Sequence, residues 1–182
     1  YLAYKQYDLS KFKSDYTVIV DKQMIDDFKE DILSSSNNSL VLIGQNNWTC
    51  TKSNYIKFRI KGGKRFVFSK NMCNFIHTGS SVVVAAIQIA YYMGVRNIFL
   101  YGIDHSFKFD PGCINGMVDG ENNHFIKNYR EGRMWYPPII KNIELAFKIC
   151  DNTLRREGGC LINCSRKTKL ELLEKRKIND CI

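Results

Sequence analysis

The sequence has no long apolar run and none of the short motifs that mark the commonest enzyme sites. No stretch approaches the roughly 18 apolar residues that a membrane-spanning helix needs, and no signal-peptide pattern occurs. The glycine-rich patterns G-x-G-x-x-G and G-x-x-x-x-G-K-[ST] are absent, and so is the G-x-S-x-G pattern around a nucleophilic serine. We therefore expect neither a membrane span nor a standard dinucleotide, P-loop or serine-hydrolase site.

Cysteine pairs with the spacing of a metal site are also missing. The seven cysteines are an odd set without a Cys-x-x-Cys pair, and the nearest two, Cys160 and Cys164, alternate with apolar residues as in a packed strand. Such usage is typical of reduced thiols in a cytoplasmic protein, and metal binding by some of them is the lesser alternative. We expect a cytoplasmic location and no metal site.

Acidic residues are fewer than basic ones, 18 against 27, which gives a formal net charge of +9. This excess favours anionic partners such as nucleotides, anionic glycans, phospholipid head groups or nucleic acid. The basic residues are scattered over Lys57–Lys70 and concentrated at Arg155–Lys177, without a basic-aromatic motif of nucleic-acid binding. We therefore expect no nucleic-acid partner. The basic segment Arg166–Lys177 is either a solvated helix face, which we favour, or a peripheral contact with anionic lipid of the inner membrane.

The order of the predicted elements indicates an α/β fold with an open, mostly parallel sheet flanked by helices. Tyr16–Val20 is rich in β-branched residues and predicts a strand, Lys22–Leu33 has the spacing of an amphipathic helix, and Leu40–Ile43 predicts the next strand. Such an order forms one right-handed crossover unit of a parallel sheet. The length and the hydrophobic share of 45% fit a single domain over residues 1–182. Because the chain opens on Tyr1, we expect an N-terminal part of the fold to be missing.

Three further predictions concern the flanks of this unit. Tyr55–Ile60 and Arg65–Ser69, with two glycines between them, predict a hairpin or two short strands at a sheet edge. Pro137 and Pro138 predict the first turn of an amphipathic helix that ends at Gly158. The last predicted elements are a strand at Cys160–Asn163 and a basic amphipathic helix or tail at Lys169–Lys177.

The strongest local pattern lies at Thr78–Phe107. Polar residues at Thr78–Ser81 predict the start of an almost wholly apolar helix that ends at Met93, where Gly94 fits a left-handed cap. The short apolar run Ile98–Tyr101 then predicts a buried parallel strand. This stretch thus combines a helix N-terminus with the carboxyl end of a strand, and we expect the rest of the chain to be organised around it.

These two backbone features predict an anion site. The helix N-terminus offers unpaired N–H groups and the positive end of a dipole, and open parallel sheets bind ligands at the carboxyl ends of their strands. Asp104 can accept from a ribose hydroxyl or hold Mg²⁺, and His105 is a candidate for proton transfer. The alternative is structural: the serines only cap the helix, Asp104 starts a turn, and His105 makes a local hydrogen bond.

The long segment 103–136 after this strand is a predicted lid. Segments of such length are usually functional lids or disordered, and the aromatic content favours a lid. His124 lies within it, and a histidine pKa near 6.5 suits a general base; a histidine with only a local hydrogen bond is the alternative. Tyr129, Arg133 and Trp135 either clamp a phosphate and stack on a base or sugar, or simply pack the lid.

Several of these stretches together resemble a family. Gly79–Gly94, Ile98–Phe107, Asn123-His124-Phe125 and Arg133-x-Trp135 resemble the bacterial MptE-like proteins, often named after 6-hydroxymethylpterin diphosphokinase and commonly found among surface-polysaccharide genes. The order and spacing match over about Tyr16–Cys164. More distantly, the chain is similar to the bacterial sialyltransferases of the family that includes the Campylobacter lipooligosaccharide enzymes.

The second resemblance implies a Rossmann-like, sialyltransferase-like fold and direct displacement of CMP from an activated sugar, without a cofactor. It implies that His124 deprotonates the acceptor hydroxyl. For the donor's phosphate or carboxylate, the resemblance implies Thr78, Gly79, Ser80 and Ser81. For the nucleotide, it implies Gly102, Ile103, Asp104, His105 and Ser106. For the lid and the substrate, it implies Asn123, Tyr129, Arg133 and Trp135. The chain departs from that family in the order Thr-Gly-Ser, in the lack of an arginine at Phe75–His77, and in Ser106 near the place of a lid tyrosine.

We therefore expect a glycosyltransferase of cell-surface glycan assembly, with a nucleotide sugar and a glycan acceptor as partners. One alternative is a pterin diphosphokinase that uses ATP and Mg²⁺, with Asp104 and His105 near the metal; another is a domain that binds a nucleotide or glycan without turnover. Metal dependence separates the two enzymes, because phosphoryl transfer uses a divalent ion. The sequence leaves the sugar, the acceptor, the linkage and homo-oligomer formation open.

Overall fold

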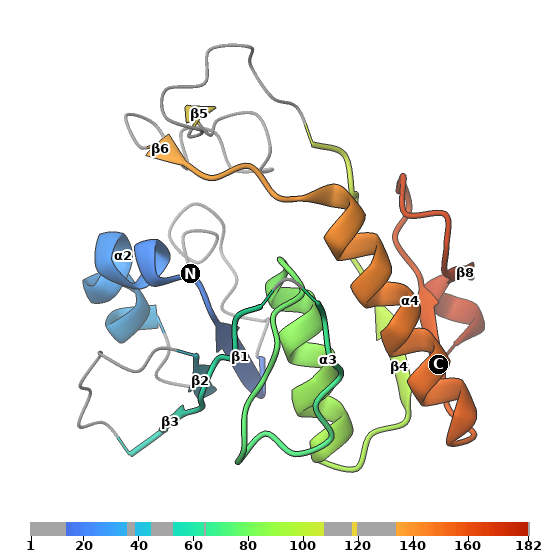
Figure 1. Ribbon diagram of the computed structural model, residues 1–182, viewed down its shortest axis with the longest axis horizontal. Helices are drawn as coiled ribbons and strands as arrows, with labels where there is room; N and C mark the ends of the chain where they lie inside the picture. Colours follow the sequence, from blue (N-terminus) through green and yellow to red (C-terminus); the bar gives the residue numbers. More distant parts are fainter. Residues whose placement is uncertain are drawn as a thin grey trace. The chain divides into compact units, whose positions relative to one another are not determined.

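The computed structural model describes residues 14–35, 39–44, 53–63, 65–107, 118–119 and 134–181 (Figure 1). Over these ranges the chain has mixed α/β content, with small parallel sheets flanked by helices and no closed barrel. The predicted α/β class is confirmed at this level. The chain divides into two compact units, Tyr1–Val95 and Arg96–Ile182.

The first unit contains a three-stranded parallel sheet in the order β1-β2-β3. Both pairings, β1 with β2 and β2 with β3, are parallel, so the predicted strand, helix and strand form the expected parallel unit. The elements of this unit are β1 (Tyr16–Ile19), α2 (Lys22–Ser35), β2 (Leu40–Ile43), β3 (Tyr55–Lys57) and α3 (Val82–Tyr92).

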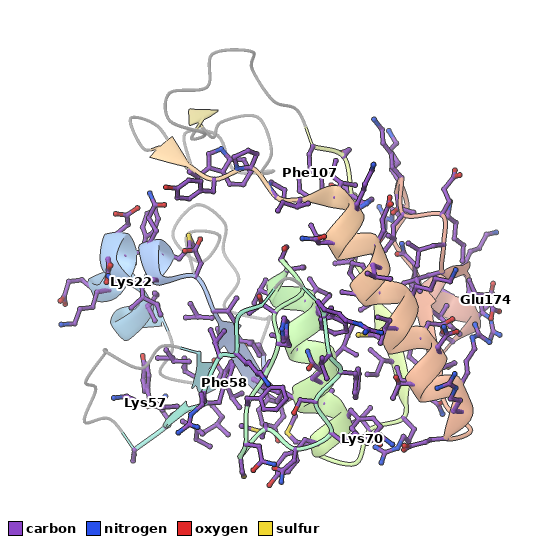
Figure 2. The ribbon with its side chains drawn as sticks, in the orientation of Figure 1. Lys22, Lys57, Phe58, Lys70, Phe107 and Glu174 are labelled. Carbon is purple, nitrogen blue, oxygen red and sulfur yellow. The ribbon has the colours of Figure 1, made fainter. Side chains whose placement is uncertain are left out.

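Helices cover both faces of this sheet. Val41 and Ile43 of β2 share one buried cluster with Ile25 and Ile32 of α2. Leu42, between them in the strand, belongs to a second cluster, which holds Phe58, Ile76, Ala85 and Ile89 and so includes the buried side of α3 (Figure 2). Alternate strand residues point to opposite faces, so β2 is buried on both sides. Burial of each large side chain stabilises the fold by roughly 1.5–3 kcal/mol.

The segment after β3 does not form the predicted hairpin. β3 is parallel to β2, and Ile60 makes an isolated parallel bridge to Ile76 rather than a turn into an antiparallel strand. Instead, the backbone N–H of Ser69 donates to Oε1 of Gln88 in α3 at 2.9 Å. The hairpin is therefore wrong, and of the alternative, two short edge strands, only the first is present, as β3. The hydrogen-bond partner of Ser69 lies in a helix further along the chain.

The start and end of α3 agree with the prediction. Ser81 is its N-cap, and the Ser81 hydroxyl accepts from the Val83 N–H at 3.3 Å. Gly94, with φ of 94°, lies just beyond Met93 in the left-handed region that ends helices. The buried Gln88 Nε2 donates to the backbone oxygens of His77 at 2.7 Å and of Val84 at 2.9 Å. Gln88 thereby holds the preceding segment against the helix.

The second unit has its own parallel sheet in the order β4-β7-β8, with α4 against β7. The strands predicted at Ile98–Tyr101 and Cys160–Asn163 are confirmed within a residue. The first, however, was expected to be buried, and its Asn97 and Phe99 are exposed. Within the described part of the predicted lid, β5 and β6 form a short antiparallel pair. The elements are β4 (Asn97–Leu100), β5 (Val118–Asp119), β6 (Met134–Trp135), α4 (Ile140–Arg156), β7 (Cys160–Asn163), β8 (Glu174–Lys175) and the 3₁₀ turn η1 (Ile178–Asp180).

The helix predicted to begin at Pro137 and Pro138 is confirmed as α4, but it begins at Ile140, so the prolines precede its first turn. The prediction for the basic C-terminal segment is wrong. The segment Lys169–Lys177 contains a strand, β8, and no helix. Its backbone pairs in parallel with the free edge of β7, because an unpaired strand edge offers the N–H and C=O partners that a helix would otherwise supply internally. The favoured solvated helix face is therefore excluded, and contact with lipid stays a prediction.

None of the helices over the described ranges combines the length and the apolar character that crossing a membrane requires.

Candidate functional site

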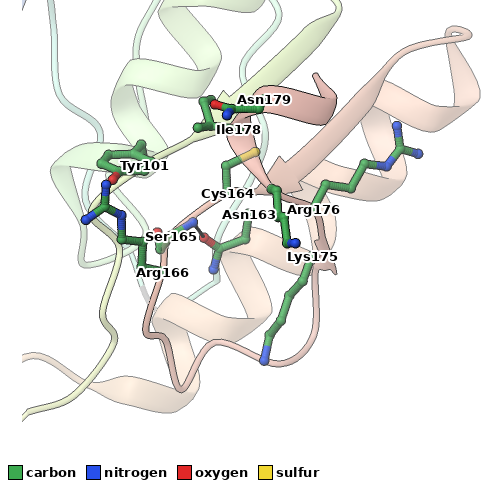
Figure 3. A pocket seen from close by; sticks show the side chains of 10 residues that line it. Tyr101, Asn163, Cys164, Ser165, Arg166, Lys175, Arg176, Ile178 and Asn179 are labelled. Carbon is green, nitrogen blue, oxygen red and sulfur yellow. Dashed lines mark hydrogen bonds between the residues drawn. The ribbon is translucent and has the colours of Figure 1, made fainter. Parts of the chain in front are cut away.

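A pocket of about 620 Å³ lies at the carboxyl edge of the second sheet (Figure 3). β4, β7 and β8 are parallel, so the residues that follow their last positions meet at one edge. This is the edge at which open parallel α/β sheets bind ligands. The pocket is lined by residues from all three strand ends and from η1: Tyr101, Asn163, Cys164, Ser165, Arg166, Lys175, Arg176, Lys177, Ile178 and Asn179.

The loop after β7 is held over this edge by a buried asparagine. The Asn163 side chain, in a residue only 1% exposed, accepts from the Ser165 N–H at 3.0 Å and donates to the Thr168 hydroxyl at 3.2 Å. That hydroxyl in turn accepts from the Leu170 N–H at 3.0 Å. One side chain therefore fixes the turn that presents Ser165 and Arg166 to the pocket.

The predicted strand-end residues adjoin the same loop. The Ile103 N–H donates to the Ser165 hydroxyl at 2.8 Å, and the Lys169 N–H donates to the Asp104 carbonyl at 2.8 Å. Ser165 lines the pocket, so Ile103 is one hydrogen bond away from it. The pocket thus adjoins the end of this strand, but none of the described residues that the sequence predicts for the site lines it, and their role stays a prediction.

Four cations line the pocket, and only one of them has a carboxylate partner. Arg176 Nε donates to Oε1 of Glu174 at 2.6 Å, which raises the pKa of Arg176 and lowers that of Glu174. In the part of the chain that the structure describes, no carboxylate pairs with Arg166, Lys175 or Lys177. The wall of the pocket therefore carries positive charge that the described part of the chain leaves without a carboxylate partner, a feature that attracts anions.

The remaining lining residues add an aromatic ring and polar groups. Tyr101 follows β4 and is 54% exposed, and Figure 3 draws it beside Arg166, with Ile178 and Asn179 in another part of the pocket. An exposed phenol ring next to cations can stack on a base or a sugar while the cations hold a phosphate. The arrangement suits an anionic ligand that also has a flat or cyclic part.

The geometry of His105 agrees with the alternative that its side chain makes a local hydrogen bond. Its side chain is 4% exposed, its Nε2 lies 3.3 Å from Oε1 of Glu144 in α4, and its ring stands edge-on to Phe107 at 5.5 Å between centroids. His105 also has a positive φ of 50°. Its buried ring therefore makes a local interaction with α4, whereas Asp104 and Ser106 on either side are exposed.

The predicted residues Thr78–Ser81 belong to the first unit. Gly79 and Ser80 have positive φ values of 55° and 66°, Ser80 is exposed, and the Ser81 N–H donates to the Thr78 carbonyl at 2.9 Å. The turn is the helix N-terminus that the sequence predicts. Its role in holding a donor stays a prediction.

The predicted lid residues Asn123, His124, Tyr129 and Arg133 lie outside the described residues. Trp135 is in β6, where its backbone is paired with Val118 of β5. Over the described ranges, no group of three or more His, Cys, Asp or Glu side chains forms a potential metal site.

Sequence reasoning missed the pocket residues from the C-terminal segment. The signal was present as the concentration of basic residues in Arg155–Lys177, but those charges were assigned to a helix. Only the pairing of β8 with β7 brings Lys175 and Lys177 to the same edge as Arg166.

Comparison of the chain with protein-family models, with curated proteins and with solved structures finds no match. The resemblance to the MptE-like and sialyltransferase families therefore stays a prediction from the residues. The chemistry of the site rests on the pocket's own geometry.

Proposed function

We propose that the chain is a sialyltransferase-like glycosyltransferase of Rossmann-like fold, and that the pocket at the edge of β4-β7-β8 holds the phosphate-bearing part of a nucleotide-activated sugar. The observation that carries this proposal is that three cations of one pocket, Arg166, Lys175 and Lys177, have no carboxylate partner among the residues that the structure describes. Cations that line one pocket give it a positive potential, and an anionic ligand is attracted to it. Each charge-assisted hydrogen bond to a phosphate is stronger than a neutral one.

The size and chemistry of the pocket support a small phosphorylated ligand. A volume of about 620 Å³ falls within the range of roughly 300–1,000 Å³ that is usual for small-molecule sites. Tyr101 and Asn179 supply a ring and an amide for the base or the sugar, and the cations supply partners for the phosphate. A nucleotide sugar has all of these parts in one molecule.

The proposed reaction needs no cofactor. An acceptor hydroxyl attacks the anomeric carbon of the donor sugar, the bond between this carbon and the phosphate oxygen breaks, and CMP leaves. The pocket cations stabilise the negative charge that develops on the leaving phosphate, which lowers the barrier. His124 is the proposed base for the hydroxyl proton, on the strength of the resemblance.

The second candidate is a domain that binds a nucleotide or a glycan without turnover. One observation favours it: among the described residues, neither His77 nor His105 lines the pocket. The described part of the site thus supplies groups for binding but no general base.

The test is a calorimetric titration with CMP, CDP and ATP, each with and without Mg²⁺, on the full chain and on Arg166→Ala. We expect CMP or CDP to bind without metal, and Arg166→Ala to weaken binding about tenfold, because a charged hydrogen bond contributes about 1.5–3 kcal/mol. Arg156→Ala is the matched control, since Arg156 is an exposed arginine of α4 outside the pocket. Equal losses in both variants would contradict the assignment of the pocket.

Turnover separates the remaining possibilities. Release of free CMP from a CMP-activated sugar, abolished in His124→Ala while CMP still binds, supports the glycosyltransferase. Binding without release in the presence of glycan acceptors supports the binding domain. Binding of ATP only with Mg²⁺ overturns both in favour of the diphosphokinase.

A further inference from the structure

Two thiols meet at the wall of the pocket. Cys164 follows β7, is 3% exposed and lines the pocket, and Cys181 directly follows η1 and is partly exposed. Their sulfur atoms lie 3.7 Å apart, although 17 positions separate them in the sequence. Every other cysteine that the structure describes is also free.

We propose that Cys164 and Cys181 are a reversible disulfide site that controls access to the pocket. The bond forms when the two sulfur atoms approach from 3.7 Å to the usual length of about 2.05 Å, so the distance between them must close by less than 2 Å. No other described pair of cysteines has an S···S contact of this kind.

The chemistry is a thiol–disulfide exchange with a small-molecule disulfide, such as oxidised glutathione, as the oxidant. The Cys181 thiolate attacks one sulfur of this disulfide, whose S–S bond breaks and releases one thiolate, and a mixed disulfide forms on Cys181. Cys164 then loses its proton and attacks the Cys181 sulfur, and the second small thiol leaves. In total, the protein loses two protons and two electrons, and the small disulfide becomes two thiols.

The two cysteines have different roles because their surroundings differ. Cys181 is partly exposed, so a small disulfide can reach it first. Cys164 is buried, and its pKa is raised by that burial and by the hydrogen bond with Cys181, with Arg176 acting in the opposite direction. Cys164 is therefore a protonated thiol at neutral pH and acts in the second step.

The position of the bond connects it to ligand binding. The loop that it closes, residues 164–181, contains all three cations without carboxylate partners and the η1 residues Ile178 and Asn179. Drawing η1 toward the end of β7 narrows the pocket between them. We therefore expect the oxidised protein to bind the anionic ligand at least tenfold more weakly than the reduced protein, an expectation that rests on the proposed function for the identity of the ligand.

The first experiment tests the bond itself. The full chain is reduced, incubated with oxidised glutathione, treated with an alkylating agent and digested for mass spectrometry. We expect a crosslinked peptide pair containing Cys164 and Cys181, retained in Cys160→Ser and lost in Cys181→Ser. Cys160 is a suitable control because it lies at the start of β7 and donates to Asn97 Oδ1 at 3.4 Å instead. A stable glutathione adduct on Cys181, or a crosslink to another cysteine, would overturn the proposal.

The second experiment tests the effect on the pocket in two ways. CMP and CDP affinities are compared between the reduced and oxidised chain, and tryptic cleavage after Arg166, Lys175 and Lys177 in the native protein is followed over time. We expect weaker binding and slower cleavage after oxidation, and no change in Cys181→Ser. Unchanged cleavage and affinity in the crosslinked chain would refute the control of access. Absence of nucleotide binding in the reduced chain, with the crosslink and slower cleavage intact, would count against the proposed function alone.

Discussion

Asn163 gives a direct test of how the fold builds the pocket. Its side chain makes two hydrogen bonds to the loop that follows it, one from the Ser165 N–H at 3.0 Å and one to the Thr168 hydroxyl at 3.2 Å. Substitution Asn163→Ala removes both. A net contribution of about 0.5–1.5 kcal/mol for each bond predicts a loss of about 1–3 kcal/mol in the free energy of unfolding.

The same substitution should impair ligand binding through the loop. Ser165 and Arg166 line the pocket and depend on that turn for their position. If Arg166 is no longer held over the edge, most of one charged contact is lost, and we expect the affinity for CMP or CDP to fall about tenfold. The two effects come from the same pair of hydrogen bonds and should appear together.

The assays are urea unfolding, followed by circular dichroism, and calorimetric titration with CMP and CDP. Asn152→Ala is the matched control, because Asn152 is an exposed asparagine of α4 outside the pocket. It should cost no more than about 0.5 kcal/mol, as surface substitutions usually do. Unfolding free energies that agree within this margin for Asn163→Ala and the wild type would refute the role of the buried amide. A loss of stability with unchanged affinity would instead show that the position of this loop does not affect ligand binding.

Three further predictions concern the fold. Gln88→Leu should reduce the free energy of unfolding by about 2–4 kcal/mol in a urea titration, because it leaves the Ser69 N–H and the His77 carbonyl without their buried partner; an unchanged midpoint would contradict these contacts. Gly159→Ala should lower the thermal midpoint and cost about 1–3 kcal/mol, since its Cβ would lie 2.2 Å from the Arg96 carbonyl oxygen; Gly62→Ala, with open space around it, is the control. Burial and Lys61 lower the pKa of His77 below its ordinary 6.5. The stability that its neutral form provides is therefore full above about pH 6.5 and is lost as the pH falls through the lower folded-state pKa, a dependence that should weaken in His77→Phe.

The strands with a clear apolar pattern could be predicted from the sequence. β2 and β7 have the predicted bounds because each is a short run of mainly apolar residues between polar or glycine residues. Each is also packed against helical structure whose apolar residues recur at helical spacing in the sequence. α3 was predictable from local chemistry, since its serine cap and its left-handed glycine both act within a few residues. In these elements, local preference and tertiary packing favour the same structure.

The wrong predictions concern segments whose structure depends on a hydrogen-bond partner far away in the sequence. The segment around Ser69 has the pattern of a hairpin strand, but its hydrogen bond goes to Gln88, 19 residues away. β8 has only two residues and no period of its own, and it exists because the edge of β7 is free to pair. Leu170 and Leu173 have a spacing that fits a helix, yet both are buried in a segment that forms none. A sequence pattern cannot locate such partners before the topology is known.

The same reasoning explains which part of the site was predictable. The rule that ligands bind at the carboxyl ends of parallel strands led to the segment after β4, and Ile103 does lie one hydrogen bond from the pocket. The cations were not predictable because a count of basic residues does not show which are compensated. Arg155 is paired with Asp151 and Glu174, and Arg176 with Glu174.

The positive charge that can attract a ligand lies where cations have no carboxylate partner among the described residues. Arg155 and Arg176 stabilise the surface around β8 through Glu174, and in doing so they lose much of their attraction for a ligand. Arg166, Lys175 and Lys177 have no such partner among the described residues, and they converge on a pocket with an exposed tyrosine. Because Glu174 and Lys175 are neighbours in one short strand, their side chains point to opposite sides of it. Lys175 therefore leaves the strand on the side opposite Glu174 and remains available to an anion, whereas Arg176 lines the same pocket with its charge paired to Glu174.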